Sequence, residues 1–163
     1  MRLRIGLVAA GLALALVVVN LGIAGRERLL REGAVVLLDL APVDPRSIMQ
    51  GDYMALRFAI AQPLQAALGD GVRHGDGFAV LARAEDGRTR FVRAQARASP
   101  LAAGEVALRY RLRAGQLRIV TNAWFFTEGE AGRWQPARFG ELRLGPDGEA
   151  LLVGLRDEAL APL

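Results

Sequence analysis

The sequence contains no cysteine and no lysine, and only one histidine, His74. Without cysteine there are no disulfide bonds, no thiolate metal ligands and no cysteine nucleophile. All 21 basic residues are therefore arginines, whose guanidinium groups cannot be deprotonated to act as a base. Because these absences remove most of the side-chain sets that hydrolases and metalloenzymes use, we expect no catalytic site, no cofactor and no bound metal.

The charge balance also argues against a nucleic-acid-binding protein. The net charge is +4, but once Arg2 and Arg4 are set aside, 19 arginines remain against 17 acidic residues, and they form no block. A phosphate-binding surface requires clustered positive charge on one face, so we expect no nucleic-acid partner. The 163 residues suffice for one ordinary domain, and a hydrophobic fraction of 52% excludes a disordered chain.

An uncharged run of twenty residues extends from Ile5 to Ala24 and follows Arg2 and Arg4. A helix of this length spans roughly 30 Å, the thickness of the hydrocarbon core of a membrane. We predict a transmembrane helix that partners the lipid bilayer, with the positively charged N-terminus in the cytoplasm. Two alternatives are a signal peptide cleaved after residues 22–24, where Gly22 and Ala24 give a tolerable small-x-small site, and a buried core helix.

The residues that follow this run favour a further two helical turns. Glu27 and Arg31 have the spacing and order of a favourable ion pair, and Gly33 is suited to end the helix in a left-handed conformation. We therefore divide the chain into residues 1–32, which form the cytoplasmic flank, the anchor helix and its extension, and residues 33–163, an extracytoplasmic domain.

Beyond Gly33 the hydrophobic period changes from helical to two, which is typical of strands. Residues 34–43 are apolar on both faces except at Asp39, which predicts a central strand. Residues 51–60 alternate clearly, and one face is expected to carry Met54, Leu56, Phe58 and Ile60. One short helix is expected over residues 62–69, since Pro63 suits a helix start and Gly69 a helix stop.

Three hairpins are predicted from their turn residues. The first turns at Asp86-Gly87 and would place Arg83 opposite Arg90, an unfavourable like-charge pair that suggests another register. The second turns at residues 114–115, pairs Leu112 with Leu117 and Tyr110 with Ile119, and returns along residues 116–126. The third turns at residues 145–148. Seven or eight such strands predict an all-β domain, mainly an antiparallel sandwich or a small barrel, with one short helix.

Residues 51–58 read GDYMALRF and carry a recognisable motif in Gly51, Asp52, Tyr53 and Leu56. Here the chain resembles the GDYXXLXY family of small bacterial membrane-anchored proteins, with Phe58 where the family name has tyrosine. The segments PVDPRSIMQ, NAWFFTEGEA, ARFGELRL and GEALLVGLRDEAL also resemble the family pattern. The resemblance implies a single-pass protein with a β-rich outer domain and a multi-span membrane protein as its partner, and it assigns no biochemical activity.

The polar residues around the motif allow two interpretations. Asp44, Arg46, Asp52 and Tyr53 either belong to a strand-entry turn needed for folding, in which Asp52 pairs with Arg46, or form a binding surface. The aromatic residues further along are equally open. On a strand, Trp124 and Phe126 point to one face and Phe125 to the other, so Trp124 and Phe125 divide between core packing and an exposed platform for a partner, a glycan or the membrane interface.

These observations favour a protein of the bacterial inner membrane whose periplasmic domain is a non-catalytic accessory or interaction subunit of an integral-membrane complex. One alternative is a periplasmic module that binds a ligand or an envelope glycan. A second is a hydrolase with a signal-peptidase-like fold and Ser47 as nucleophile. That mechanism requires a lysine base, which the chain lacks, and His74 lies in a glycine-rich loop where we expect it to be solvated.

Overall fold

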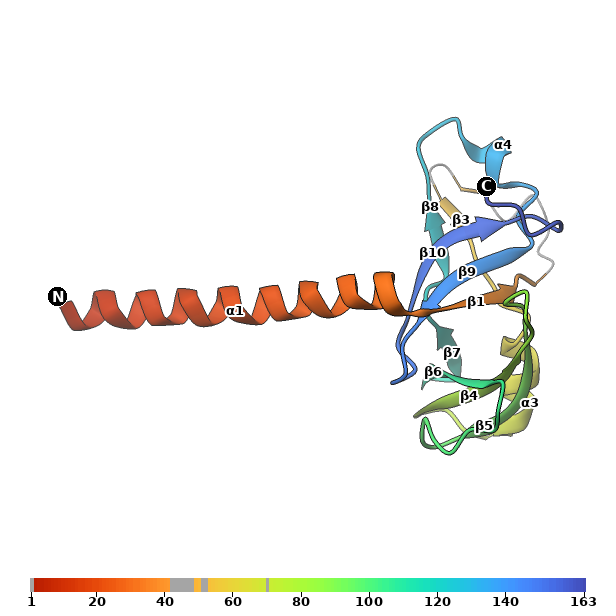
Figure 1. Cartoon of the computed structure of the whole chain (residues 1–163), viewed down its shortest axis with the longest axis horizontal. Coiled ribbons are helices and arrows are strands. Elements are labelled where there is room, and N and C mark those ends of the chain that lie inside the picture. Colours follow the sequence, from red (N-terminus) through yellow and green to blue (C-terminus); the bar gives the residue numbers. More distant parts are fainter. Residues whose placement is uncertain (1, 42–48, 51–52, 70) are drawn as a thin grey trace.

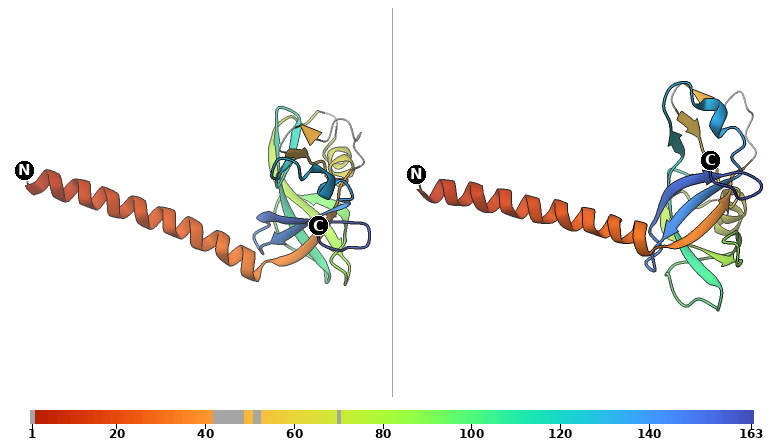
Figure 2. Two further views of the ribbon diagram at one scale, coloured as in Figure 1. Left: turned by 90° about the horizontal axis from the view of Figure 1, so that it is seen from above. Right: turned by 45° about the horizontal axis from the view of Figure 1, so that its top comes forward.

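The computed structural model describes residues 2–41, 49–50, 53–69 and 71–163. One long helix, α1 (Arg2–Glu32), projects from a head that consists mostly of strands (Figure 1). The two further views show the same arrangement, with the helix leaving the head from one side (Figure 2). The predicted order of an apolar helix followed by an antiparallel β domain is confirmed.

Helix α1 is long and apolar enough to cross a membrane over residues 10–32, and this stretch is exposed along its length. The alternative of a buried core helix is therefore wrong. The predicted extension is present, and Arg31 contacts Glu27 at 3.5 Å. The predicted left-handed conformation of Gly33 is wrong, because its φ is not positive. A side chain there would instead collide with the carbonyl oxygen of Leu29, so close approach explains the glycine.

The head contains ten strands and two short helices among the described residues. In chain order the elements are β1 (Ala34–Asp39), β2 (Met49–Gln50), β3 (Tyr53–Ala55), α3 (Ala61–Leu68), β4 (Gly75–Arg83), β5 (Thr89–Gln95), β6 (Glu105–Arg113), β7 (Gln116–Ile119), β8 (Ala123–Phe125), α4 (Ala131–Trp134), β9 (Phe139–Leu144) and β10 (Ala150–Arg156).

These strands form three antiparallel sheets with the orders β1-β9-β10, β2-β3-β8 and β5-β4-β6-β7. The described strands do not close into a barrel, so the barrel alternative is not adopted. The main core lies between the first and third sheets and is completed by Leu64 of α3. Its largest fully buried side chains include Leu38, Leu81, Leu108 and Leu142. A second, smaller core lies against β10 and contains Met54, Leu56, Trp134 and Leu155.

Residues 53–59, the described part of the motif segment, connect two of the sheets. Residues 53–55 pair with β8, and the amide of Leu56 continues this edge by donating to the carbonyl of Asn122 at 2.8 Å. Farther along, the amide of Ala59 donates to the carbonyl of Asp39 at 2.9 Å. The segment thus leaves the β2-β3-β8 sheet and ends against β1. Its predicted alternation is confirmed, because Met54, Leu56, Phe58 and Ile60 are all buried.

The first hairpin adopts a register other than the one with Arg83 opposite Arg90, as the like-charge pair suggested, because it pairs Arg83 with Thr89. Two details of the predicted strands are wrong. Strand β1 is at the edge of its sheet and not in the centre, and the amide of Leu37 donates to the carbonyl of Gly87 at 2.8 Å. Residues 116–126 do not form one strand, since Val120 has a φ of 54° and the chain moves to another sheet.

Candidate functional site

The predicted motif residues fall into two groups. Asp44, Arg46, Gly51 and Asp52, together with Ser47, lie outside the described residues, so the proposed pairing of Asp52 with Arg46 stays a prediction. Tyr53, Leu56 and Phe58 are described. Leu56 belongs to the smaller core and Phe58 to the main core, where its ring packs against Gly140. Phe58 thus packs in the core between the β1-β9-β10 sheet and the β5-β4-β6-β7 sheet.

Half-buried Tyr53 and exposed Phe125 form an aromatic pair, which we call the aromatic face. They stand opposite each other across β3 and β8, with ring centroids 5.8 Å apart. The side chain of Phe125 is 74% exposed, which makes it the most exposed large hydrophobic residue of the described head. Strand β8 lies on the side of the head from which α1 leaves (Figures 1 and 2). The prediction that Phe125 points to the opposite face of the strand from Trp124 and Phe126 is confirmed.

Trp124 points to the opposite face of β8 and belongs to the smaller core. Its ring meets that of Trp134 in an edge-on contact with centroids 5.3 Å apart. Arg133 lies over the ring of Trp134 at 4.7 Å, a cation–π distance. Trp124 therefore supports the strand that displays Phe125, and the predicted alternative of Trp124 as part of an exposed platform is wrong.

A groove lies beside the described part of the motif segment. Its walls are residues 55–58, Ala61 and Gln65 of α3, and the continuous stretch 115–122, and it encloses about 830 Å³. We call this space the motif groove. One wall is the end of the GDYXXLXY-like segment, and the other is β7 with the connection that follows it. A groove of this size is within the range of ligand-binding clefts.

The charged side chains among the described residues of the motif groove are all positive. Arg57 and Arg118 line it, and no aspartate or glutamate is among the lining residues that the structure describes. Neither arginine has a carboxylate partner within the described part of the chain. By contrast, Arg113 of the neighbouring strand holds Asp76 through contacts of 2.6 and 3.1 Å, and its guanidinium lowers the pKa of that carboxyl. Within the part of the chain that the structure describes, the groove therefore carries the unpaired positive charges of Arg57 and Arg118.

The corner of the groove contains a strained backbone position. Val120 has a φ of 54°, which is rare for a β-branched residue and costs on the order of 1–3 kcal/mol. The hydroxyl oxygen of the next residue, Thr121, accepts a hydrogen bond from the amide of Ala123 at 3.3 Å, which holds this residue in place. This corner directs the chain from β7 to the residue that bonds Leu56, so the strain shapes the groove.

A comparison with protein-family models matches residues 15–155 to the model described as GDYXXLXY protein. The match covers most of α1 and nearly the whole head. The chain belongs to the GDYXXLXY family. No curated protein and no solved structure matches this chain. For this GDYXXLXY protein the family assignment therefore brings no activity with it, and the chemistry has to come from its own residues.

Catalytic and metal chemistry find little support among the described residues of this GDYXXLXY protein. No group of three or more histidine, aspartate or glutamate side chains is placed to hold a metal ion in this part of the chain. His74 is exposed, and its Nε2 accepts the amide of Ala114 at a long 3.4 Å. This contact engages a main-chain amide, so it does not activate a nucleophile.

Sequence reasoning missed the second wall of the groove. The sequence predicts that Arg118 and Val120 belong to one long strand over residues 116–126, and such a strand would not lie opposite the motif segment. The available signal was the hairpin itself, because its register places Arg118 directly opposite Arg111, leaving two positive charges together. Nothing in the sequence marks Val120 as the residue that turns the chain.

Proposed function

We propose that this GDYXXLXY protein is a non-catalytic accessory subunit of an integral-membrane complex in the bacterial inner membrane. In this proposal α1 crosses the bilayer once and the head lies on the periplasmic side. The exposed apolar length of α1 supports membrane insertion, because such a surface has no favourable place in water.

The distribution of charge around α1 supports a cytoplasmic N-terminus. Arg2, Arg4 and the amino terminus precede the apolar run with no acidic residue among them. On the head side two of the three arginines are paired with glutamates, as in the 2.8 Å contact between Arg28 and Glu32. A positive flank before a first apolar helix is retained in the cytoplasm, and a long domain after that helix is translocated largely regardless of its charge.

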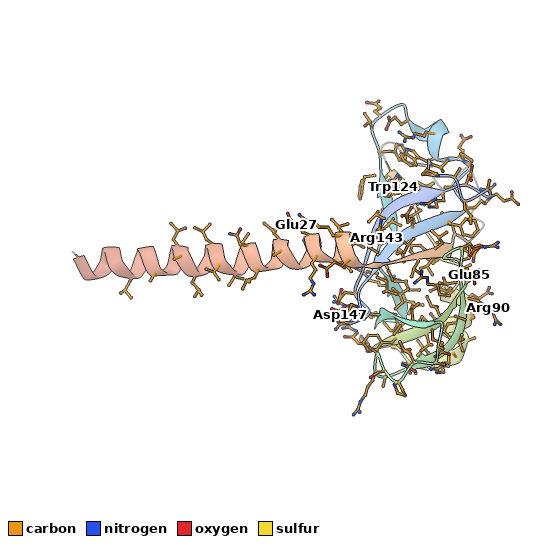
Figure 3. The ribbon with its side chains drawn as sticks, in the orientation of Figure 1. Glu27, Glu85, Arg90, Trp124, Arg143 and Asp147 are labelled. Carbon is orange, nitrogen blue, oxygen red and sulfur yellow. The ribbon has the colours of Figure 1, made fainter. Side chains whose placement is uncertain are left out.

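The length of α1 beyond the apolar run supports a partner that is also in the membrane. Helix α1 continues from Ala24 to Glu32, which adds about 12 Å and is enough to cross the headgroup layer of one leaflet, roughly 5–8 Å thick. Arg143 and Asp147 lie beside the end of α1, whereas Arg90 lies away from it (Figure 3). The helix side of the head is thus close to the membrane surface, where the parts of multi-span proteins that leave the bilayer are found.

The exposure of Phe125 is the observation that carries the proposal. Exposed aromatic rings of this size are enriched at protein interfaces and dominate their binding energy. The ring is supported by Tyr53 of the family motif, and its strand, β8, lies on the side of the head from which α1 leaves (Figure 1). We therefore assign the aromatic face as the contact with the membrane partner.

The experiment is affinity purification of the full-length chain from bacterial membranes in a mild detergent. Wild type is compared with Phe125→Asp and with Val92→Asp. Val92→Asp is the control because Val92 is also exposed but lies on β5, in the four-stranded sheet and not in the sheet of Phe125. We expect wild type and the control to recover an integral-membrane protein at a fixed stoichiometry. Phe125→Asp should recover about tenfold less, since it places a charge at a central aromatic contact.

Circular dichroism and thermal melting of all three proteins show whether folding is intact. Equal recovery of the partner by Phe125→Asp and wild type would contradict the assignment of the aromatic face. Recovery of the chain alone from every sample would contradict the proposed role as a subunit.

A further inference from the structure

Strand β7 is the free edge of the four-stranded sheet, and its hairpin determines which of its backbone groups are unused. Ala114 and Gly115 have φ values of 52° and 78°, the two positive values of a type I′ turn. The flanking pair is Arg113 with Gln116, followed by Leu112 with Leu117. In a two-residue hairpin the flanking residues exchange hydrogen bonds and the pairs then alternate. Leu117 and Ile119 therefore direct their N–H and C=O groups away from β6.

These outward groups face the motif groove. All four residues of β7 line the groove, and residues 55–58 and α3 line its far side. Within the described residues no strand other than β6 pairs with β7. The four residues of β7 span about 13 Å, which matches an extended segment of four to six residues. Leu117 is half-buried and Ile119 is buried, but their outward groups have no strand partner among the described residues, and an unpaired row of donors and acceptors is the feature that binds an added strand.

The charge of the groove selects the kind of segment. Arg57 lies on the motif wall and Arg118 on β7, and no carboxylate is among the described residues of the lining. Some arginines elsewhere in the head are paired with a carboxylate, as in the 2.6 Å contact between Arg93 and Glu105, whereas Arg57 and Arg118 have no such partner among the described residues. An added strand with acidic side chains would neutralise both groove arginines, while a basic strand would be repelled.

We propose that the motif groove binds an acidic, extended polypeptide segment as an additional strand on the free edge of β7. This inference rests on the proposed role as a binding subunit and specifies a second contact, separate from the aromatic face. Main-chain hydrogen bonds from Leu117 and Ile119 would provide binding that depends little on side chains. Arg57 and Arg118 would provide the preference for acidic partners.

The test uses full-length protein in detergent micelles and a synthetic peptide, acetyl-(Val-Glu)₃-amide, with acetyl-(Val-Arg)₃-amide as the control peptide. Amide hydrogen exchange of β7 is followed by NMR. We expect the acidic peptide to slow exchange of the Leu117 and Ile119 amides about tenfold or more. The Arg118 amide should change little, because it already bonds to β6. The basic peptide should leave all three amides unchanged.

A charge-reversed double variant, Arg57→Glu with Arg118→Glu, should lose protection by the acidic peptide and gain it from the basic one. The matched control is Arg90→Glu, since Arg90 is exposed and lies away from the groove. Unchanged exchange at millimolar acidic peptide would overturn the inference. Equal protection by both peptides would also overturn it, because the groove would then not select charge.

This outcome is separable from that of the proposed function. If Phe125→Asp loses the membrane partner while the peptide leaves β7 unprotected, the subunit role stands and the strand-binding groove falls. If no partner is recovered by any protein, the subunit role falls, whatever the peptide does.

Discussion

The hydroxyl of Thr89 on β5 donates a 2.8 Å hydrogen bond to the main-chain oxygen of Leu37 on β1. Thr89 is the buried polar residue of the described head, and its bond joins the four-stranded sheet to the sheet that receives α1. The amide of Leu37 donates to the main-chain carbonyl of Gly87 beside this bond. Both the N–H and the C=O of Leu37 therefore connect the two sheets.

Replacing Thr89 with valine tests this connection. The variant keeps the shape of the side chain but leaves the buried Leu37 carbonyl with no hydroxyl donor. We expect a loss of about 1–3 kcal/mol in the free energy of unfolding, measured by urea denaturation of the full-length chain. Thr127→Val serves as the control, because Thr127 is exposed, and it should unfold like wild type. Equal stability of the two variants would mean that the bond contributes nothing.

Phe58 of the motif and Phe125 of the aromatic face should separate into a structural residue and a binding residue. Phe58 is 4% exposed and packs in the main core, so Phe58→Ala should cost about 3–5 kcal/mol. Phe125→Ala should cost less than about 0.5 kcal/mol, because most of its ring is in solvent. Urea denaturation measures both. A large loss of stability in Phe125→Ala would show that this ring is structural and would weaken its assignment as a contact.

Acid should weaken the contact between Glu105 and Arg93. Hydrogen bonds from Arg93 at 2.6 and 2.9 Å, and then from the amide of Ala102, lower the pKa of the Glu105 carboxyl. A lowered folded-state pKa means that the stabilisation is present above the ordinary glutamate pKa and disappears as the pH falls through the folded value. Stability should therefore decline on acidification below about pH 4.3.

Glu105→Gln isolates this effect, since the amide does not ionise. Melting temperatures are measured from neutral to acid pH for wild type, Glu105→Gln and Glu128→Gln, an exposed control. The difference between wild type and Glu105→Gln should shrink as the pH falls, while Glu128→Gln should follow wild type. A difference that is constant with pH would contradict the assigned role of the charge.

Local chemistry explains which parts of the fold were predictable. The hairpin at residues 114–115 has the predicted register, with Tyr110 opposite Ile119, because turn residues and alternating side chains are adjacent in sequence. The burial of Met54, Leu56 and Phe58 follows from the same alternation. The ion pair of Glu27 with Arg31 required only helical spacing.

Tertiary packing explains what was not predictable. The edge position of β1 depends on its contact with Gly87, fifty residues away in sequence. The break at Val120 contradicts the intrinsic preference of valine and is imposed by the move to another sheet. The motif groove joins residues 55–58 to residues 115–122, so neither wall alone predicts it.

The most direct test of the account is the position of the head relative to the membrane. Because the chain has no cysteine, the single variant Arg97→Cys provides one thiol on the head surface, and a cysteine inserted after Met1 provides one at the other end. Intact spheroplasts are treated with a membrane-impermeant maleimide, and the membrane fraction is analysed for labelled, full-length chain.

The account predicts that Arg97→Cys is labelled in intact spheroplasts and stays in the membrane fraction, whereas the N-terminal cysteine is labelled only after permeabilisation. Labelling of Arg97→Cys only after lysis would place the head in the cytoplasm and contradict the account.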